Sequence, residues 1–256
     1  MTRIIAVANQ KGGVGKTTTS VNLSASLSLA GHRTLLLDLD PQGNATTGSG
    51  VDKTGLAISM RDWLMDDAAL EDVLQSCPGG FDLVPCNSDL TAAEVELLAV
   101  DGREARLRRR LASAEAVQRY SYLIMDCPPS LNILTLNALV AADSVLIPMQ
   151  CEYYALEGLT ALLNTVNQIR RRANPRLTVQ GLLRTMYDPR NGLTRDVSRQ
   201  LIAHFGNKVF RTVIPRNVRL AEAPSHGLPA ILYDRHSRGA IAYMALAAEL
   251  VKAEET

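Results

Sequence analysis

The sequence has few of the residues that mark several classes of protein. Its 256 residues include four cysteines, Cys77, Cys86, Cys127 and Cys151, and no Cys-x-x-Cys pair. This spacing suggests neither a structural zinc site nor a disulfide framework, so we expect buried free thiols. No stretch approaches ~20 uninterrupted apolar residues, which disfavours a membrane span. The first expected strand begins by Arg3, so we expect no signal peptide and a cytosolic protein.

Net charge is also small, because 27 Lys and Arg residues nearly balance 26 Asp and Glu residues. The two halves differ, however: residues 151–256 hold 15 basic and 9 acidic side chains, whereas residues 1–150 hold 12 and 17. The arginines of the second half could form a phosphate-contacting surface or simply lie solvated on helix faces, and composition favours neither. A further cluster, Arg106 to Arg110, is expected on a solvated helix face.

The most informative segment reads Asn-Gln-Lys-Gly-Gly-Val-Gly-Lys-Thr-Thr and predicts a phosphate-binding loop. Gly12, Gly13 and Gly15 let backbone N–H groups converge on a polyphosphate without Cβ atoms in the way. Lys16 can reach the β and γ phosphates, and the hydroxyl of Thr17 can bind Mg²⁺. We therefore expect a nucleotide and Mg²⁺ as ligands, with Val14 and Thr18 completing the loop that surrounds the nucleotide.

The loop departs from the usual pattern and sits in the expected context. The usual motif has glycine where this chain has Gln10, and here a second lysine, Lys11, follows it. An apolar run precedes the loop and a helical pattern follows it, which is the strand, loop and helix order that the motif requires. The phosphates would then lie at a helix N-terminus, where free N–H groups and the helix dipole favour anions.

Apolar runs alternate with helical patterns along the whole chain. The runs lie at residues 3–8, 33–37, 81–85, 121–125, 143–149, 177–183 and 209–214, and helices are expected within residues 16–30, 60–76, 90–119, 130–141, 156–173, 192–205 and 237–253. Several runs are apolar at consecutive positions, as strands covered on both faces must be. The pattern predicts an α/β fold in which residues 1–256 form one domain: a doubly wound, mostly parallel sheet with helices on both faces.

Acidic residues follow two of these strands, at the sheet edge where ligands bind. Asp126 ends an apolar run, which gives a magnesium-supporting carboxylate the rigid mounting that it needs. Asp38 and Asp40 end another run. We expect these two to face different ways along the extended chain, so that only one points at the γ-phosphate and its attacking water.

Five ordered motifs, spread from about residue 3 to residue 250, resemble the ParA/Soj chromosome-partitioning ATPases. They are Lys-Gly-Gly-Val-Gly-Lys-Thr-Thr-Thr, Asp-Leu-Asp-Pro-Gln-Gly-Asn, Asp-Cys-Pro-Pro-Ser, Glu-Tyr-Tyr-Ala-Leu-Glu-Gly and Val-Ile-Pro-Arg-Asn-Val-Arg-Leu-Ala-Glu-Ala-Pro-Ser-His-Gly. The resemblance implies a P-loop ATPase that hydrolyses ATP to ADP and phosphate with Mg²⁺.

The resemblance also implies roles for single residues. Lys11 would reach the nucleotide of a partner subunit, Asp40 would position the hydrolytic water, and Asp126 would be the Walker B carboxylate. Pro215 and Asn217 match the stretch that the family uses at the adenine. The remaining implied contacts are Lys16 at the phosphates, Thr17 at Mg²⁺, and Asp38 beside the metal and switch loop.

The resemblance further implies partners. Two subunits would close around two ATP molecules, and this homodimer would bind double-stranded DNA without sequence preference through Arg190 and Arg219, with Arg216 as a neighbour of undefined role. A ParB-like centromere-binding protein would stimulate hydrolysis and so release the DNA. The protein would then be cytoplasmic and nucleoid-associated. Arg184 departs from the family, which usually has an aliphatic residue in that strand, so we expect its strand end to be more exposed or paired.

Two other readings share the loop. A MinD-like positioning ATPase for another cargo would need a basic amphipathic C-terminal helix, whereas this chain ends in the acidic Lys-Ala-Glu-Glu-Thr, so no membrane partner is expected. A non-enzymatic binding module is the other reading, and measurable ATP turnover would exclude it. The sequence does not identify the cargo.

Overall fold

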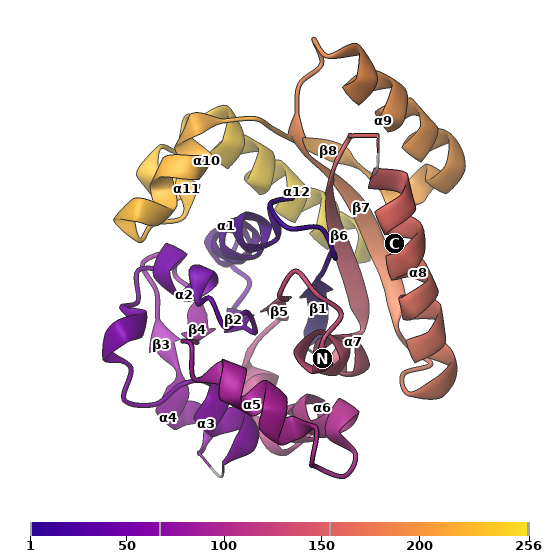
Figure 1. Ribbon diagram of the computed structural model, residues 1–256. Coiled ribbons are helices and arrows are strands. Elements are labelled where there is room, and N and C mark those ends of the chain that lie inside the picture. The colour runs from indigo at the N-terminus through magenta and orange to yellow at the C-terminus, as the bar shows by residue number, and fades with distance from the viewer. Residues whose placement is uncertain (1, 67, 154, 255–256) are drawn as a thin grey trace.

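The core of the protein is one mixed sheet, shown in Figure 1. The computed structural model describes residues 2–66, 68–153 and 155–254. Within them the sheet has eight strands in the order β3-β4-β2-β5-β1-β6-β7-β8. The strands are β1 (Arg3–Val7), β2 (Thr34–Asp38), β3 (Gln75–Ser76), β4 (Asp82–Val84), β5 (Tyr122–Asp126), β6 (Ser144–Gln150), β7 (Thr178–Tyr187) and β8 (Val209–Pro215). All neighbours pair in parallel except β3 and β4, so the expected doubly wound sheet is confirmed.

Helices cover both faces of this sheet. They are α1 (Lys16–Leu29), α2 (Asn44–Gly48), α3 (Met60–Met65), α4 (Leu70–Val73), α5 (Leu90–Leu97), α6 (Arg106–Ser113), α7 (Ile133–Ala141), α8 (Ala155–Arg172), α9 (Gly192–Phe205), α10 (Val218–Glu222), α11 (Ala230–Tyr233) and α12 (Arg238–Glu254). Short 3₁₀ turns lie at Lys53–Gly55, Arg103–Ala105, Glu115–Arg119, Gly206–Lys208 and Ala223–His226. Helix α1 packs with α11 and α12 on one face, whereas α3, α5, α6, α7 and α8 form a contiguous layer on the other.

One expected helical segment proved to be more complex. Residues 60–76 contain α3 and α4 but end in β3, which pairs antiparallel with β4. A tight turn joins these two strands: the N–H of Gly80, at φ 77°, donates to the carbonyl of Cys77, and the N–H of Cys77 donates to that of Phe81. Glycine tolerates this left-handed conformation, so Pro78-Gly79-Gly80 was the sequence signal for the missed hairpin.

The apolar strands divide their side chains between two cores. Leu35 and Leu37 of β2 lie in the core under α3 and α5 to α9, whereas Leu36 lies in the core under α1 and α12. Successive side chains of a strand point to opposite faces, so a central strand covered twice must be apolar at every position. This arrangement fixes the backbone at the carboxyl ends of β1, β2 and β5, where Val7, Asp38 and Asp126 lie in register.

The arginines of α6 form a solvated face only in part: Arg108 and Arg109 are exposed, as the sequence predicts, whereas Arg106 and Arg110 are half-buried. The guanidinium of Arg106 donates to the carbonyls of Leu64 and Met65, and that of Arg110 donates to the carbonyl of Ala68. The neighbouring arginines of the cluster bind carbonyls as well, at Ala173 for Arg108 and at Asp101 and Gly102 for Arg109. A helix end leaves its last carbonyls without intrahelical partners, and Arg106 satisfies two of them at the end of α3.

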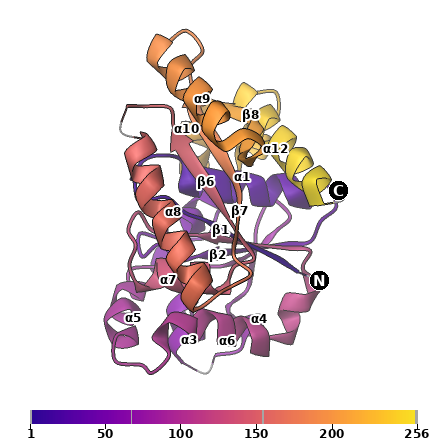
Figure 2. The ribbon, with the colours of Figure 1, turned by 90° about the vertical axis from the view of Figure 1, so that its right-hand side faces the viewer.

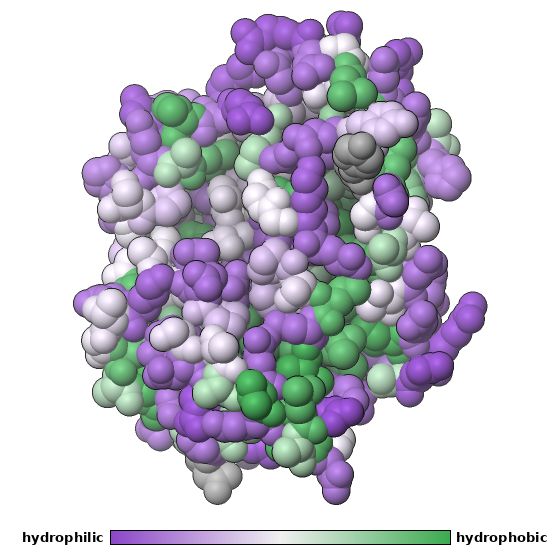
Figure 3. All heavy atoms as spheres, viewed as in Figure 1, coloured by the Kyte–Doolittle hydropathy of each residue, from purple (hydrophilic) through white to green (hydrophobic). Residues whose placement is uncertain are grey.

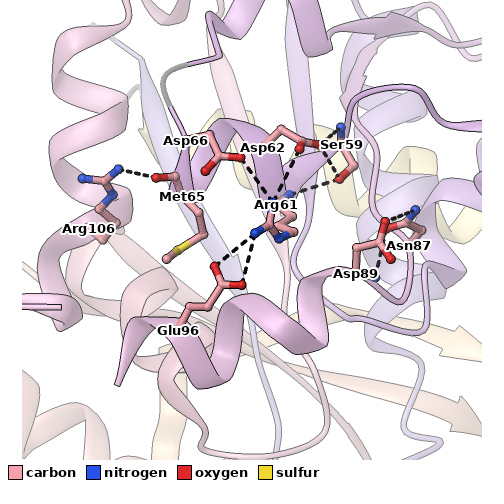
Figure 4. A network of polar contacts seen from close by, with 9 residues as sticks. All are labelled: Ser59, Arg61, Asp62, Met65, Asp66, Asn87, Asp89, Glu96 and Arg106. Atoms are coloured by element: carbon pink, nitrogen blue, oxygen red, sulfur yellow. Dashed lines mark hydrogen bonds and ion pairs between the residues drawn. The ribbon is translucent and has the colours of Figure 1, made fainter. Parts of the chain in front are cut away.

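Figure 4 shows how the same region ties α3 to α5. Arg61 of α3 binds both carboxylate oxygens of Glu96 at 3.1 and 3.2 Å and also pairs with Asp66. Ser59 and Asp62 form a capping box that begins α3. Helix packing in this layer therefore rests on fixed polar contacts in addition to the apolar core.

Arg184 is buried and paired, so the expectation of pairing is confirmed and that of exposure is wrong. Its side chain is 7% exposed, on β7 next to an irregularity in the β7–β8 register. Its guanidinium donates to Ser198 Oγ at 2.9 Å and to the carbonyls of Phe210 and Arg211 at 2.8 and 3.1 Å. One arginine thus links β7 and β8 to α9.

We predict that Arg184→Met lowers the free energy of unfolding by ~2–4 kcal/mol, because it leaves buried oxygen acceptors without a donor. Urea denaturation measures this change. Arg211→Met is the matched control: its side chain is exposed on the neighbouring strand, and we expect a change below ~0.5 kcal/mol. An Arg184→Met protein as stable as the wild type would contradict the role of the guanidinium.

Candidate nucleotide-binding site

The glycine-rich loop lies between β1 and α1, where the sequence predicts it. Gly13 and Gly15 have φ angles of 71° and 86°, a left-handed conformation that other residues adopt only under strain. An added Cβ would meet no atom within 4 Å at Gly12 or Gly13, so the space above this part of the loop is open. Helix α1 starts immediately after Gly15, and its first N–H groups therefore face the open side.

Three residues that the sequence analysis did not single out hold the loop in place. Asn9 donates to the carbonyl of Pro148 at 2.7 Å and accepts from the N–H of Lys11 at 3.0 Å. The hydroxyl of Thr185 donates to the carbonyl of Val14 at 2.8 Å, and the amide of Gln150 donates to the carbonyl of Gly13 at 3.1 Å. Gln150 and Thr185 lie near the carboxyl ends of β6 and β7. This position, at the sheet edge where ligands bind, is the one sequence signal that could have identified them.

Lys16 is buried inside the loop. Its side chain is 7% exposed, and its ammonium donates to the carbonyl of Lys11 at 3.1 Å. Burial lowers the pKa of Lys16, while the nearby Asp126, Cys127 and Asp40 act in the opposite direction. A cation held here with few partners is well placed to attract phosphate oxygens.

Asp126 lies directly below the loop. Its two carboxylate oxygens accept hydrogen bonds from the hydroxyls of Thr17 and Ser20, each at 2.8 Å. The side chain is fully buried, and burial raises the pKa of Asp126 although both hydroxyls stabilise its charged form. The structure thus brings together Thr17 and Asp126, as the sequence predicts, and adds Ser20 to them.

Asp38 is turned toward α2. Its carboxylate accepts from the N–H and the hydroxyl of Thr46 at 2.8 and 2.7 Å, and from the N–H of Asp40 at 3.2 Å. Burial raises the pKa of Asp38, and the charge of Asp126 raises it further. Asp38 and Asp126 are buried carboxyls that disfavour each other's ionisation, so a cation bound between them would be stabilised by both.

Asp40 lies in the loop after β2, and one of its carboxylate oxygens accepts from the N–H of Gln42 at 3.0 Å. The side chains of Asp40 and Asp38 therefore have different partners and point in different directions, as expected. The expected reason, alternation along an extended chain, is wrong. Residues two apart along a strand share a face; the two aspartates differ because β2 ends at Asp38. Asp40 is close enough to Lys16, Asp126 and Glu94 to influence their pKa values.

Lys11 points away from the loop that contains it. Its side chain is 44% exposed, and its ammonium pairs with the carboxylate of Glu152 at 2.5 Å. Glu152 follows β6 and was not identified from the sequence, although it begins the Glu-Tyr-Tyr-Ala-Leu-Glu-Gly motif. An exposed pair of this kind contributes little stability, so Lys11 can exchange this partner at low cost.

A cavity of about 190 Å³ lies beside the loop. Gly15 and Thr18 line it from the start of α1, and Pro215 and Asn217 line it from the segment between β8 and α10. The rest of the lining is Thr185, Met186, Ile214, Arg216, Leu220, Ala221 and Tyr243. Asn217 also caps α10, because its side-chain oxygen accepts from the N–H groups of Arg219 and Leu220. Residues some 200 positions apart thus form one largely apolar pocket.

The three arginines suggested as a DNA surface lie near this same end of the molecule. Arg190 is 89% exposed in the loop between β7 and α9 and pairs with Asp188, whose pKa it lowers to about 2. Arg219 is 47% exposed on α10 and pairs with Glu222 and Asp234. Arg216 lines the cavity, and its charge also lowers the pKa of Asp188. Exposed arginines of this kind remain accessible to phosphates.

Comparison with known proteins agrees with this geometry. A family model described as an AAA domain matches residues 2–179. The chain is 53% identical over 251 residues to the sporulation initiation inhibitor protein Soj of Bacillus subtilis, with 98% of each chain covered. It is 49% identical over 254 residues to the chromosome partitioning protein ParA of Caulobacter vibrioides, with 98% of this chain and 95% of the relative covered.

Solved structures share the fold. A cobyrinic acid a,c-diamide synthase from Mycobacterium smegmatis, solved with a bound ATP analog and magnesium, has a TM-score of 0.87 and 39% identity, covering 100% of this chain and 97% of that one. The described residues contain no helix long and apolar enough to cross a membrane. Because relatives named Soj and ParA are 48–53% identical over almost the whole chain, the chain belongs to the ParA/Soj family of chromosome-partitioning ATPases.

Proposed function

We propose that this chain is a single ATPase domain that binds ATP with Mg²⁺ and hydrolyses it to ADP and phosphate. The observation that carries the proposal is the arrangement around Asp126: a buried carboxylate bonded to Thr17, beneath a left-handed glycine loop that holds Lys16. The open loop accommodates the phosphates, and the cavity lined by Pro215 and Asn217 accommodates the base.

The side chains present fit a magnesium ion. Mg²⁺ in phosphoryl-transfer sites is held by one or two protein oxygens together with phosphate oxygens and water. Thr17 and Asp126 supply such oxygens, and Asp38 adds a second buried carboxyl whose ionisation a nearby cation would favour. When bound, the ion neutralises phosphate charge. Thr17 and Asp126 would hold it, with Asp38 linking that position to Thr46 and α2.

Hydrolysis requires a water molecule aligned with the γ-phosphate. Asp40 is the carboxylate that we assign to this task, because it lies in the loop after β2 and acts electrostatically on both Lys16 and Asp126. Its carboxylate accepts a hydrogen bond from the water and so orients a lone pair of the water oxygen toward phosphorus. The oxygen of this water forms a bond to the γ-phosphorus while the P–O bond to ADP breaks, and the proton that the water loses ends on the released phosphate. Lys16 stabilises the negative charge on the phosphates.

ATP is proposed to join two copies of the chain. Lys11 leaves Glu152 and contacts the phosphates of the other subunit, an exchange that the exposure of this ion pair permits. The face shown in Figure 3 carries apolar surface in the area over α5 and α7. Val95 of α5 and Leu98, which follows that helix, are exposed apolar side chains of the chain. Burying such surface would favour association.

The ATP-bound dimer is proposed to bind double-stranded DNA without sequence preference through Arg190 and Arg219, with Arg216 as their neighbour. Phosphate contacts from two subunits add, so dimerisation couples ATP to DNA affinity. The family assignment supports a ParB-like centromere-binding protein as the partner that stimulates hydrolysis and so releases the DNA. The protein is then cytoplasmic and associated with the nucleoid, and its function is DNA segregation.

We predict that Lys11→Ala retains ATP binding but loses ATP-dependent dimerisation by more than about tenfold, because a charge-assisted contact to phosphate across the interface is lost. Light scattering with ATP measures the dimer, and equilibrium titration measures nucleotide affinity. Glu152→Ala is the matched control, since it removes only the partner of Lys11 and should dimerise. Lys16→Ala should bind no ATP. A Lys11→Ala protein that dimerises like the wild type would assign this lysine to the loop alone.

We predict that Asp40→Ala binds ATP and dimerises but hydrolyses ATP at least ~100-fold more slowly, because it loses the alignment of water while keeping the phosphate cradle. Phosphate release gives the rate, and light scattering shows whether the dimer persists after ATP is added. Turnover within a few-fold of the wild type would move this role to another residue.

We predict that Arg190→Glu or Arg219→Glu weakens DNA binding more than about tenfold, because each reversal replaces attraction by repulsion and occurs twice in a dimer. ATP binding and dimerisation should persist. Affinity is measured on unrelated duplexes at two salt concentrations, with Arg176→Glu, at the amino end of β7, as the control. Strong preference for one duplex, or wild-type affinity in both variants, would exclude these arginines as the DNA surface.

A further inference from the structure

One face of α8 lines a row of hollows that the nucleotide site does not use. Leu156, Thr160, Leu163, Asn167 and Arg170 follow each other at spacings of 4, 3, 4 and 3 residues, and each lines one of three neighbouring hollows. Such spacing places side chains along one side of a helix, as in the seam of a coiled coil. At 1.5 Å per residue this seam is about 21 Å long.

The opposite side of these hollows comes from α9, β7 and the turn after α9. The first hollow, of about 490 Å³, lies between Leu156 and Thr160 on one side and Gln200, Ala203, His204 and Phe205 on the other. The second, of about 280 Å³, shares Phe205 and has Leu163, Val179 and Leu182 as its apolar lining. Figure 2 shows the side of the molecule on which α8 and α9 lie. We call this row of hollows the α8–α9 groove.

The far end of the groove is basic. Arg170 and Lys208 line the second hollow, and Arg170 and Arg171 line a third of about 270 Å³ together with Asn167 and Pro175. Lys208 donates to the carbonyl of Val179 at 3.1 Å, which places its charge over the apolar floor. None of the described lining residues is Asp or Glu. The sequence also has no acidic residue between Gly158 and Tyr187.

We propose that the α8–α9 groove binds one amphipathic helix of a partner protein, with acidic side chains at the end that meets Arg170, Arg171 and Lys208. The apolar floor takes side chains of the partner at positions i, i+3 or i+4, and i+7. Duplex DNA is a poorer fit, because its phosphates would contact only the basic end of the groove and gain nothing from the apolar floor. The charge of the groove selects the acidic helix over a basic one.

This groove is separate from the nucleotide site. Thr178, the first residue of β7, lies beside its second hollow, so the basic end is at the amino edge of the sheet. The glycine loop and Asp126 lie at the carboxyl edge. The groove and the cavity beside the glycine loop share none of their described lining residues, so a helix bound in the groove would leave that cavity open. Groove variants should therefore keep basal ATP turnover unchanged.

The test uses three synthetic, fluorescein-labelled peptides and the full chain. The first is a helix of about five turns with leucines at heptad spacing and glutamates at one end. The second has the same composition in shuffled order, and the third has lysine in place of glutamate. Fluorescence anisotropy should show that the first binds about tenfold or more tightly than either control. Hydrogen exchange should slow in residues 156–171 and 200–208 when it binds.

Variants locate the binding. Arg170→Glu combined with Lys208→Glu should weaken the first peptide about tenfold or more, because two attractions become repulsions. Ala203→Trp, at an exposed position of α9, fills the first hollow without a charge change and should weaken it similarly. Arg172→Glu combined with Arg176→Glu is the matched control, since neither residue is among the described lining residues, and it should bind normally.

Several results would overturn the proposal. The proposal is overturned if the first peptide fails to bind or if the shuffled peptide binds equally well. It is also overturned if the control variant loses as much affinity as the double variant Arg170→Glu with Lys208→Glu. A nucleic-acid surface would instead be indicated if a DNA duplex bound wild type, displaced the peptide and lost affinity in the groove variants. The melting temperature of each variant should equal that of the wild type, which shows that a loss of peptide affinity does not come from unfolding.

Discussion

The structure depends on the burial of three ionisable side chains at one site. Lys16, Asp38 and Asp126 are buried at the carboxyl edge of the sheet, and burial disfavours the charged form of each. Hydrogen bonds from Thr17 and Thr46 offset part of this cost. The rest is offset only when phosphates and a cation enter, so the site is built for a charged ligand rather than for stability.

The same residues connect the ligand to segments that lie some distance from it. Asp38 holds Thr46 of α2, and α2 packs on the turn at Ala223–His226 that follows α10. Gly50 and Gly227, both at positive φ, approach so closely that a Cβ on either would come within 2.8 Å of the other's backbone. Backbone-to-backbone packing at this point leaves no side chain between α2 and the segment that follows α10.

The arginines of this chain serve different purposes according to burial. Arg106 and Arg184 donate to carbonyls at the end of α3 and beside a strand irregularity, and Arg110 donates to the carbonyl of Ala68, so these three arginines are part of the fold. Arg190 and Arg219 lie on the surface in ion pairs that cost little to break. Charge counted along the sequence does not separate these groups, because a guanidinium can satisfy backbone acceptors as well as bind phosphate.

The sequence by itself determined the α/β fold, the glycine loop with Lys16 and Thr17, and Asp126 at a strand end, because periodicity and local motifs are properties of neighbouring residues. Other features needed the tertiary structure. The pairing of Lys11 with Glu152 joins residues 141 positions apart, and the cavity beside the glycine loop joins Thr18 to Asn217. The burial of Arg184 and the seam of α8 likewise depend on how strands and helices pack, which no local pattern records.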